Sequence, residues 1–149
     1  MKKLLFLLCS ISILFAACNK DYEKANKAEI EKYIADKKWT AQSTASGLYY
    51  VIDTPGGAAR PIASSTVTIH YVGTLTDGTK FDSSRDRGAP FTSELNRLIQ
   101  GWIEGIPLFG KGGKGKLLIP ASLGYGSSSQ GSIPANSVLV FDIELIDFK

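Results

Sequence analysis

Two long segments in which apolar and polar residues alternate set the strongest limit on the fold of this 149-residue chain. The odd-numbered residues of the first, TVTIHYVGTL at 66–75, share one face. The second, VLVFDIELIDF at 138–148, alternates apolar residues with Asp142 and Glu144. Because side chains two residues apart lie on the same face of a strand, both segments are predicted to be strands with one buried face.

Shorter strands are predicted around these two. GLYYVID at 47–53 is rich in aromatic and β-branched residues, and a Pro-Gly-Gly turn follows it at 55–57. Asp77-Gly78 is a strong hairpin signal, so the first alternating strand is expected to turn back there. KGKLLIP at 114–120 is predicted to be a further strand.

One short helix is predicted over SELNRLIQGWIEGI, residues 93–106. Ser93 is a candidate N-cap, and Gly101 limits the length of the helix. The apolar residues at helical spacing are Leu95, Leu98, Ile99, Trp102 and Ile103. Four or five strands with one helix predict an α+β domain, in which an antiparallel sheet packs one face on the helix and exposes the other to water.

The N-terminus has the pattern of a secretory signal peptide that ends in a cysteine. Lys2 and Lys3 precede an apolar run at 4–17 of about 14 residues, shorter than the roughly 20 residues of a membrane-spanning helix. The run ends in LFAAC, which resembles a bacterial lipobox, although Phe15 stands where leucine is usual. In such a motif the cysteine is lipidated and becomes the new N-terminus, so Cys18 is the predicted lipidation site.

Cysteine usage favours lipidation over the alternative, an ordinary signal peptide with an incidental cysteine nearby. Cys9 is the only other cysteine and lies inside the segment that would be removed. Cys18 would then be a lone thiol in an oxidising compartment, which is usually avoided. The mature chain can form no disulfide, and one cysteine with one histidine, His70, predicts no metal site.

Charge and motifs exclude several classes of function. Without Lys2 and Lys3 the chain has 15 basic and 14 acidic residues, so it lacks the basic excess of a nucleic-acid-binding protein. The single histidine has no serine motif near it, which argues against a Ser/His/Asp triad. GKGGKGK at 110–116 lacks the order of a phosphate-binding loop and precedes a strand. No cofactor is predicted.

Residues 19–38 are rich in Lys, Glu and Ala and contain no Gly or Pro, which favours a helix. Its apolar stripe is thin and consists of Ala25, Ala28, Ile30, Tyr33 and Ile34. The preferred interpretation is a solvated spacer that holds the domain off the membrane. A helix for dimerisation or docking is the alternative. The chain is thus predicted to divide into a signal peptide at 1–17, a lipidated N-terminus and spacer at 18–43, and a globular domain at 44–149.

The order of five motifs resembles the FKBP-type peptidyl-prolyl cis-trans isomerases. They are HYVGTLTDGTKFDSSRDRGAPF at 70–91, LIQGWIEGI at 98–106, KLLIP at 116–120, GYG at 124–126 and IPANSVLVFDIEL at 133–145. The similarity runs from about Ser46 to Lys149 and implies a curved antiparallel sheet that half-wraps one short helix, with an apolar pocket between them. The lipobox and the charged helix resemble the bacterial lipoprotein members.

The resemblance also implies a set of site residues. The aromatic walls of the pocket would be Tyr71, Phe81, Phe91 and Phe141, with Trp102 as the floor. Leu98, Ile99 and Ile133 match aliphatic positions around the pocket, and the Ile99 N–H would bind a substrate carbonyl. Asp82 and Tyr125 match the two polar groups aimed into it, and Arg87 matches the arginine that holds the aspartate and tyrosine in place. Without the family motifs, these aromatic residues would be interpreted as ordinary core.

The loop SSSQGSIP at 127–134 departs from the family pattern. It is about one residue shorter than in the best-known members and has no histidine where they often place one; Gln130 is nearest. The departure affects the expected substrate preference beyond the proline and the contacts with macrolide inhibitors of the family.

The sequence therefore predicts an enzyme that accelerates rotation of X-Pro bonds in proteins of the bacterial cell envelope. Its expected partners are proline-containing polypeptides, macrolide inhibitors of the family, and the membrane through an N-terminal lipid, facing the periplasm or in the outer membrane. The alternative is a chaperone-like or partner-binding module whose isomerase activity is secondary. The absence of a nucleophile or metal suits the reaction, because no covalent bond changes when an amide rotates.

Overall fold

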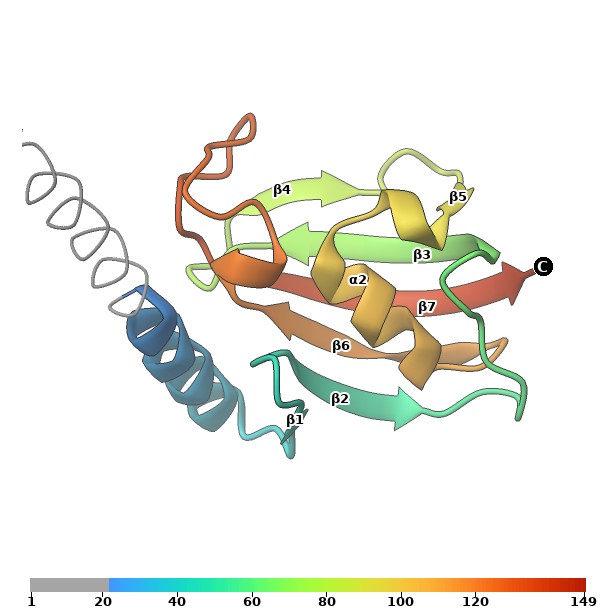
Figure 1. The fold of residues 1–149 in the computed structure, drawn as a ribbon, viewed down its shortest axis with the longest axis horizontal. Coiled ribbons are helices and arrows are strands. Elements are labelled where there is room, and N and C mark those ends of the chain that lie inside the picture. The colour runs from blue at the N-terminus through green and yellow to red at the C-terminus, as the bar shows by residue number, and fades with distance from the viewer. Residues whose placement is uncertain (1–21) are drawn as a thin grey trace, which may run out of the picture.

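A single antiparallel sheet curves around a short helix in the computed structural model, which describes residues 22–149 (Figure 1). The strands are β1 (Gln42–Ser43), β2 (Tyr49–Thr54), β3 (Thr66–Thr74), β4 (Lys80–Ser83), β5 (Phe91–Glu94), β6 (Gly113–Ile119) and β7 (Leu139–Phe148). Helix α2 (Gln100–Gly105) crosses one face, and single 3₁₀ turns are formed by η1 (Leu95–Arg97), η2 (Ile106–Leu108) and η3 (Ala121–Leu123). The predicted α+β class is confirmed.

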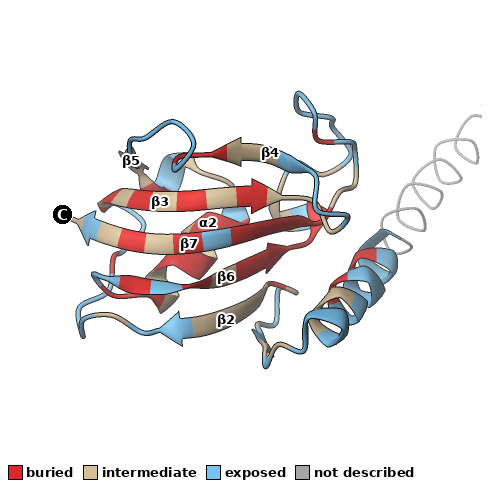
Figure 2. Ribbon diagram, turned by 180° about the vertical axis from the view of Figure 1, so that it is seen from behind, coloured by how far each residue is buried: buried red, intermediate tan, exposed pale blue. Residues whose placement is uncertain are grey.

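The sheet is built around the two alternating segments, which are neighbours. Its order is β1-β2-β6-β7-β3-β4, and β5 pairs with Thr66–Ile69 of β3, the part that β4 does not pair with. Buried and partly buried residues alternate along all nine residues of β3, as the sequence pattern predicted (Figure 2). The Asp77-Gly78 turn is also confirmed, because Gly78 has a φ of +90° and Asp77 accepts a hydrogen bond from the Thr79 N–H at 2.8 Å.

The predicted start of the helix at Ser93 is wrong. Ser93 pairs with Val67 in the β3–β5 ladder, and the α-helix begins only at Gln100. The apolar periodicity misled because a strand, a 3₁₀ turn and a helix in succession all direct apolar residues such as Leu95 into the same core. Pairing with β3 satisfies the backbone of residues 91–94, so a helix there has no advantage.

Helix α2 lies very close to the sheet because two glycines face it. A Cβ atom at Gly101 would lie 2.5 Å from a side-chain carbon of Ile119, and one at Gly105 would lie 2.6 Å from Leu117. Both distances are below van der Waals contact, so larger residues would push the helix away from β6. The close approach buries Trp102 against the inner face of the sheet.

The outer face of the sheet is not uniformly exposed to water. Ile30, on a helix that covers residues 22–37, is fully buried against Leu118, Val138 and Val140. Leu118 and Val140 are paired across β6 and β7 and point away from the inner core. The preferred interpretation of residues 19–38 as a solvated spacer is therefore corrected for the described helix, which packs on the chain's own domain.

Polar contacts hold the same helix at two further points. The Tyr49 hydroxyl donates to Glu31 at 2.9 Å, and Thr76 in the β3–β4 turn donates to Glu29. The thin apolar stripe of the sequence is thus sufficient for docking, since a single buried isoleucine is supported by hydrogen bonds on either side. No helix within residues 22–149 is both long and apolar enough to cross a membrane. The predicted signal peptide and Cys18 lie outside the described residues.

Ile30→Ala is expected to lower the free energy of unfolding by about 2–5 kcal/mol, as other isoleucine truncations in cores do. Urea denaturation followed by circular dichroism measures the change. Lys24→Ala, on the exposed side of the same helix, is the matched control and should change it by less than about 0.5 kcal/mol. Equal stabilities of the two variants would contradict docking of the helix.

Candidate functional site

A cavity of about 530 Å³ lies between helix α2 and the inner face of the sheet. Its wall is formed by Tyr71, Phe81, Asp82, Phe91, Arg97, Leu98, Ile99, Trp102, Tyr125, Gln130, Gly131, Ser132, Ile133 and Phe141. Ten of the eleven pocket residues named from the sequence are among them; Arg87 is not. The volume lies within the range of roughly 300–1,000 Å³ that is common for small-molecule sites.

Five aromatic rings from five different elements form the apolar part of this cavity. Trp102 of α2 lies 5.1 Å, between ring centroids, from both Tyr71 of β3 and Phe141 of β7. Phe81 of β4 contacts Phe141 at 5.6 Å, and Phe91 of β5 contacts Trp102 at 6.1 Å. All these contacts are edge-to-face, the geometry that aromatic quadrupoles favour. The rings therefore support one another and leave a preformed hollow.

Gly73 makes room for two of these rings. A Cβ atom at this position would lie 2.5 Å from the Phe81 ring and 3.0 Å from Phe141. Gly73 lies on the face predicted to point inward, but no role was predicted for it. A glycine in the middle of an otherwise β-branched and aromatic strand is the signal that could have identified it.

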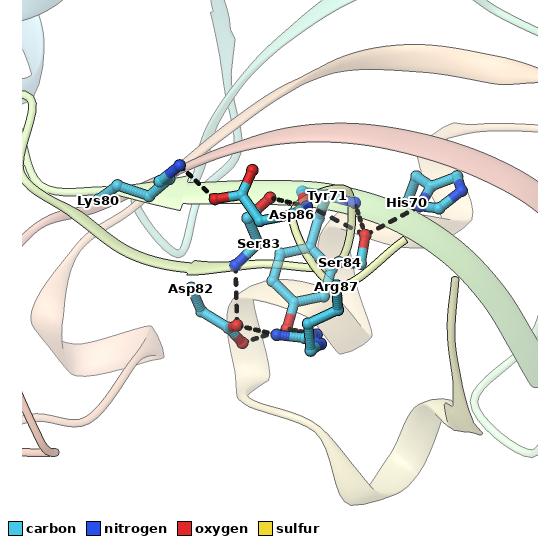
Figure 3. A network of polar contacts seen from close by, with 8 residues as sticks. All are labelled: His70, Tyr71, Lys80, Asp82, Ser83, Ser84, Asp86 and Arg87. Carbon is cyan, nitrogen blue, oxygen red and sulfur yellow. Dashed lines mark hydrogen bonds and ion pairs between the residues drawn. The ribbon is translucent and has the colours of Figure 1, made fainter. Parts of the chain in front are cut away.

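The loop between Phe81 and Phe91 is fastened to β3 by Ser84, which is fully buried (Figure 3). The Tyr71 N–H donates to Ser84 Oγ at 2.8 Å, and the Ser84 N–H donates to the Tyr71 carbonyl at 3.1 Å. Ser84 Oγ also lies 3.0 Å from His70 Nδ1. Ser84 thus continues the pairing of β4 after the strand ends. This role was not predicted, because a serine in a polar loop resembles any other.

Asp82, Tyr71 and Arg87 form one polar network beside the cavity (Figure 3). The Tyr71 hydroxyl donates to Asp82 Oδ2, and Arg87 donates to Asp82 Oδ1. Arg87 also donates to the Tyr71 hydroxyl at 3.1 Å. The tyrosine that Arg87 holds is therefore Tyr71. Tyr125 lies at the cavity's rim, and its side chain makes no hydrogen bond to another described residue.

The network shifts the pKa values of its two acidic groups, Asp82 and Tyr71, in opposite directions. Partial burial opposes ionisation of Asp82, but the hydrogen bonds from Tyr71 and Arg87 and the guanidinium charge outweigh it, so the pKa of Asp82 is lowered. Burial and the hydrogen bond to Asp82 raise the pKa of Tyr71. At neutral pH the pair is a carboxylate and a neutral phenol, and the phenolic proton is committed to Asp82. Tyr71 thus keeps its ring fixed against Trp102 and Phe141.

Other charges of this loop lie outside the cavity. Asp86 pairs with Lys80, and Arg85 reaches Glu144 on β7 at 2.7 Å. The Lys80–Asp86 pair is exposed and contributes little to stability, whereas the Arg85–Glu144 pair is only partly exposed. Arg97, Gln130, Gly131 and Ser132 line the cavity but were not named as site residues. Gln130 was noted only as the residue nearest the place of a histidine, and nothing in the local pattern marks the others.

Donor groups at the cavity are left for a ligand. Among residues 22–149 the Ile99 N–H donates to no backbone oxygen, although Ile99 itself lies in the cavity wall. In the same range the only buried side-chain donor without a protein partner is Trp102 Nε1. That range contains no cluster of three His, Cys, Asp or Glu residues suited to a metal. The site can therefore hold an apolar ring and bind a carbonyl without forming a covalent bond.

A curved antiparallel sheet closed over one short helix, with a five-ring cavity between them, defines an FKBP-like domain. The family model described as FKBP-type peptidyl-prolyl cis-trans isomerase matches residues 57–146. The chain therefore belongs to the FKBP-type peptidyl-prolyl cis-trans isomerase family.

Relatives named FKBP-type peptidyl-prolyl cis-trans isomerase FkpA are similar over most of this chain. The Aeromonas hydrophila protein is 52% identical over 123 residues, which cover 81% of this chain and 46% of that protein. The protein of Escherichia coli strain K12 is 44% identical over 129 residues, covering 87% of this chain and 47% of that protein. The chain thus spans about half the length of these curated relatives.

Two crystal structures are similar to this fold. FkpA from Escherichia coli superposes with a TM-score of 0.76 and 37% identity, covering 97% of this chain and 70% of that one. AtFKBP13 superposes with a TM-score of 0.68 and 35% identity, covering 74% of this chain and 99% of that one. The first match includes part of the N-terminal region, while the second covers less of this chain.

Arg87→Met is expected to raise the pKa of Asp82 toward its ordinary value, because it removes both a hydrogen bond and a positive charge. A carboxyl-carbon NMR titration measures this pKa directly. Arg85→Met is the control: Arg85 lies in the same loop as Arg87, but it pairs with Glu144 of β7. This variant should leave the pKa of Asp82 unchanged.

Arg87→Met should also change how the stability of the protein depends on pH in the acidic range. A folded pKa below the unfolded value stabilises the protein above the unfolded pKa, and this stabilisation is lost as pH falls through the folded pKa. Arg87→Met should therefore flatten the decrease of stability on acidification across that window. An unchanged pKa of Asp82 in the variant would contradict the role of Arg87 in this network.

Proposed function

We propose that this protein is a peptidyl-prolyl cis-trans isomerase that accelerates rotation of X-Pro bonds in proteins of the bacterial cell envelope. The observation that carries the proposal is the five-ring cavity, with the Asp82–Tyr71–Arg87 network at its edge. A pyrrolidine ring suits such a hollow in size and polarity. Membership of the family supports the same activity.

The reaction needs a change of environment more than a reactive group. Amide resonance gives a rotation barrier of about 18–20 kcal/mol, and the twisted amide loses both that resonance and much of its dipole. Water solvates the planar, more polar ground state better than it solvates the twisted state. An apolar cavity removes that advantage, so it stabilises the transition state relative to the ground state.

The aromatic residues carry this differential effect. Tyr71, Phe81, Phe91, Trp102 and Phe141 would enclose the proline ring, and their mutual contacts mean that little reorganisation is needed on binding. A thousandfold acceleration corresponds to about 4 kcal/mol, which is modest for a site of this kind. Preformed walls therefore account for a useful rate without a nucleophile.

The polar and aliphatic residues at the edge would orient the chain on either side of the proline. Because the Ile99 N–H donates to no backbone oxygen among residues 22–149, it can bind a substrate carbonyl, so that only one side of the amide rotates. Asp82 acts on the cavity through Tyr71, while Tyr125 supplies a hydroxyl at the rim. Leu98 and Ile133 would contact the substrate's apolar parts, and Arg87 is a positioning residue.

The cavity also suits the apolar part of a larger inhibitor. We propose macrolide inhibitors of the family as ligands of the same site, because their binding requires an apolar hollow with few oriented polar groups. Gln130, Gly131 and Ser132 would contribute part of that contact, and the short 127–134 loop would modify it.

Attachment to the membrane is proposed through a lipid on Cys18, with a signal peptide at 1–17 and the isomerase domain at 44–149. The lipobox-like LFAAC carries this part, and two or more acyl chains would give stable anchoring. A chain of four residues can span at most about 14 Å, so Cys18 lies no further than this from Tyr22, the first described residue. Because that helix packs on the domain, the domain would lie near the membrane surface instead of on a long tether.

Asp82→Ala is expected to reduce kcat/KM for proline-containing peptides about tenfold, because a charge-assisted hydrogen bond that orients Tyr71 is worth about 1.5 kcal/mol. A protease-coupled or NMR exchange assay with varied residues before proline measures the rate. Asp86→Asn, in the same loop but outside the cavity, should retain the activity. An uncatalysed rate for the folded wild-type protein would rule out the proposed activity.

Mass spectrometry of the protein isolated from membranes of the producing bacterium is expected to find Cys18 as the N-terminal residue, carrying acyl chains. Cys18→Ser lacks the thiol that is acylated, so it should yield no lipidated N-terminus. Recovery of an unmodified Cys18 in the mature protein would refute the anchor and would leave the isomerase proposal unaffected.

A further inference from the structure

Asn26, on the helix at 22–37, holds both ends of the segment that forms one rim of the cavity. Asn26 is only 4% exposed, although asparagine is polar. The Ala121 N–H donates to Asn26 Oδ1 at 2.8 Å, and Asn26 Nδ2 donates to the Asn136 carbonyl at 3.1 Å. Between these two points the chain carries the rim residues Tyr125, Gln130, Gly131, Ser132 and Ile133.

These two hydrogen bonds close a ring with two others. The Gly126 N–H donates to the Ala121 carbonyl at 2.8 Å, and the Asn136 N–H donates to the Gly126 carbonyl at 2.8 Å. The ring therefore passes through Ala121, Gly126, Asn136 and the side chain of Asn26. Within residues 22–149, Asn26 supplies the only hydrogen bonds that join the 121–137 segment to a part of the chain distant in sequence.

The chemistry of the ring requires an amide side chain. Ala121 presents a donor and Asn136 presents an acceptor, so the bridging group must accept on one side and donate on the other. An asparagine amide offers both from one planar group, whereas aspartate and leucine do not. Asn136 also has a positive φ of 60°, a conformation that few residues other than glycine adopt, and its carbonyl is fixed there by Asn26.

Asn26 can act as a fixed point because its helix is itself immobilised. Ile30, one turn further along, is fully buried against the outer face of the sheet. Glu29 and Glu31 bind Thr76 and Tyr49 on either side of it. The helix therefore connects the outer face of the sheet to the rim of a cavity that lies on the inner face.

We propose that Asn26 is a positioning residue for the recognition of the polypeptide around the proline, and this inference rests on the proposed function of the cavity. A proline ring fills the aromatic floor, so the flanking chain must leave across the open rim. Tyr125, which is 38% exposed, and Gln130 lie where that chain passes. By fixing the ends of the 121–137 segment, Asn26 lowers the cost of ordering the rim when substrate binds.

Asn26→Leu tests the proposal, since it keeps the approximate volume of the side chain and removes both hydrogen bonds. We expect a rise in KM of about three- to tenfold, the cost of ordering a few rim side chains, with kcat changed less than about twofold. Preferences among peptides that differ in the residue before proline should become weaker. Asn26→Ser, which can retain one of the two hydrogen bonds, should lie between Asn26→Leu and the wild type.

Glu29→Ala is the matched control, because it removes a helix contact with Thr76 and leaves the ring intact. Its KM and its peptide preferences should equal those of the wild type. Hydrogen exchange of the Ala121 amide should be faster in Asn26→Leu and unchanged in Glu29→Ala. A role confined to docking the helix would instead change KM equally in both variants, and that result would overturn the proposal.

Peptide affinity measured without catalysis separates this inference from the proposed function. Intrinsic tryptophan fluorescence can follow the titration of a proline-containing peptide into each folded variant, because Trp102 lies at the cavity floor. Weaker binding by Asn26→Leu supports the inference, even if the wild type proved catalytically inactive. Equal Kd and KM values for folded wild type, Asn26→Leu and Asn26→Ser would overturn it.

Discussion

The close packing of helix α2 on the sheet is the constraint on which the site depends. Gly101 and Gly105 let the helix approach β6 to a distance that any Cβ atom would prevent. The approach brings Trp102 within 5.1 Å of both Tyr71 and Phe141, measured between ring centroids. A helix even slightly further away would leave the floor of the cavity unsupported, because the rings hold their positions by contact with one another.

Electrostatics at the edge of the cavity serve the same purpose as packing at its floor. The Asp82 carboxylate fixes the hydroxyl of Tyr71, and Arg87 binds both groups. The network is partly exposed, so its contribution to global stability is small. Its effect is local: it restrains the orientation of one ring in a cavity whose shape determines the chemistry. An apolar site can thus be maintained by polar groups placed just outside it.

Much of this arrangement was predictable from the residues, and the exceptions have physical causes. Alternation in β3 and β7, the Asp77-Gly78 turn and the family motifs around Phe81 and Trp102 are local patterns, and they predicted the fold class and most of the cavity's lining. Ser93 was misplaced because the same apolar spacing suits a strand followed by a 3₁₀ turn and a helix.

The sequence by itself determined the two long strands β3 and β7, the hairpin turn at Asp77-Gly78, and the inward direction of Tyr71 and Phe141, because period-two alternation and turn chemistry act over only a few residues. Only the tertiary structure decided that the charged N-terminal helix packs on the outer face, that Arg87 holds Tyr71, and that Asn26 closes a ring with Ala121 and Asn136. The hydrogen bonds of Asn26 join residues 95 and 110 positions apart. Local spacing carries no information about such pairs, because their geometry exists only after the sheet has curved around its helix.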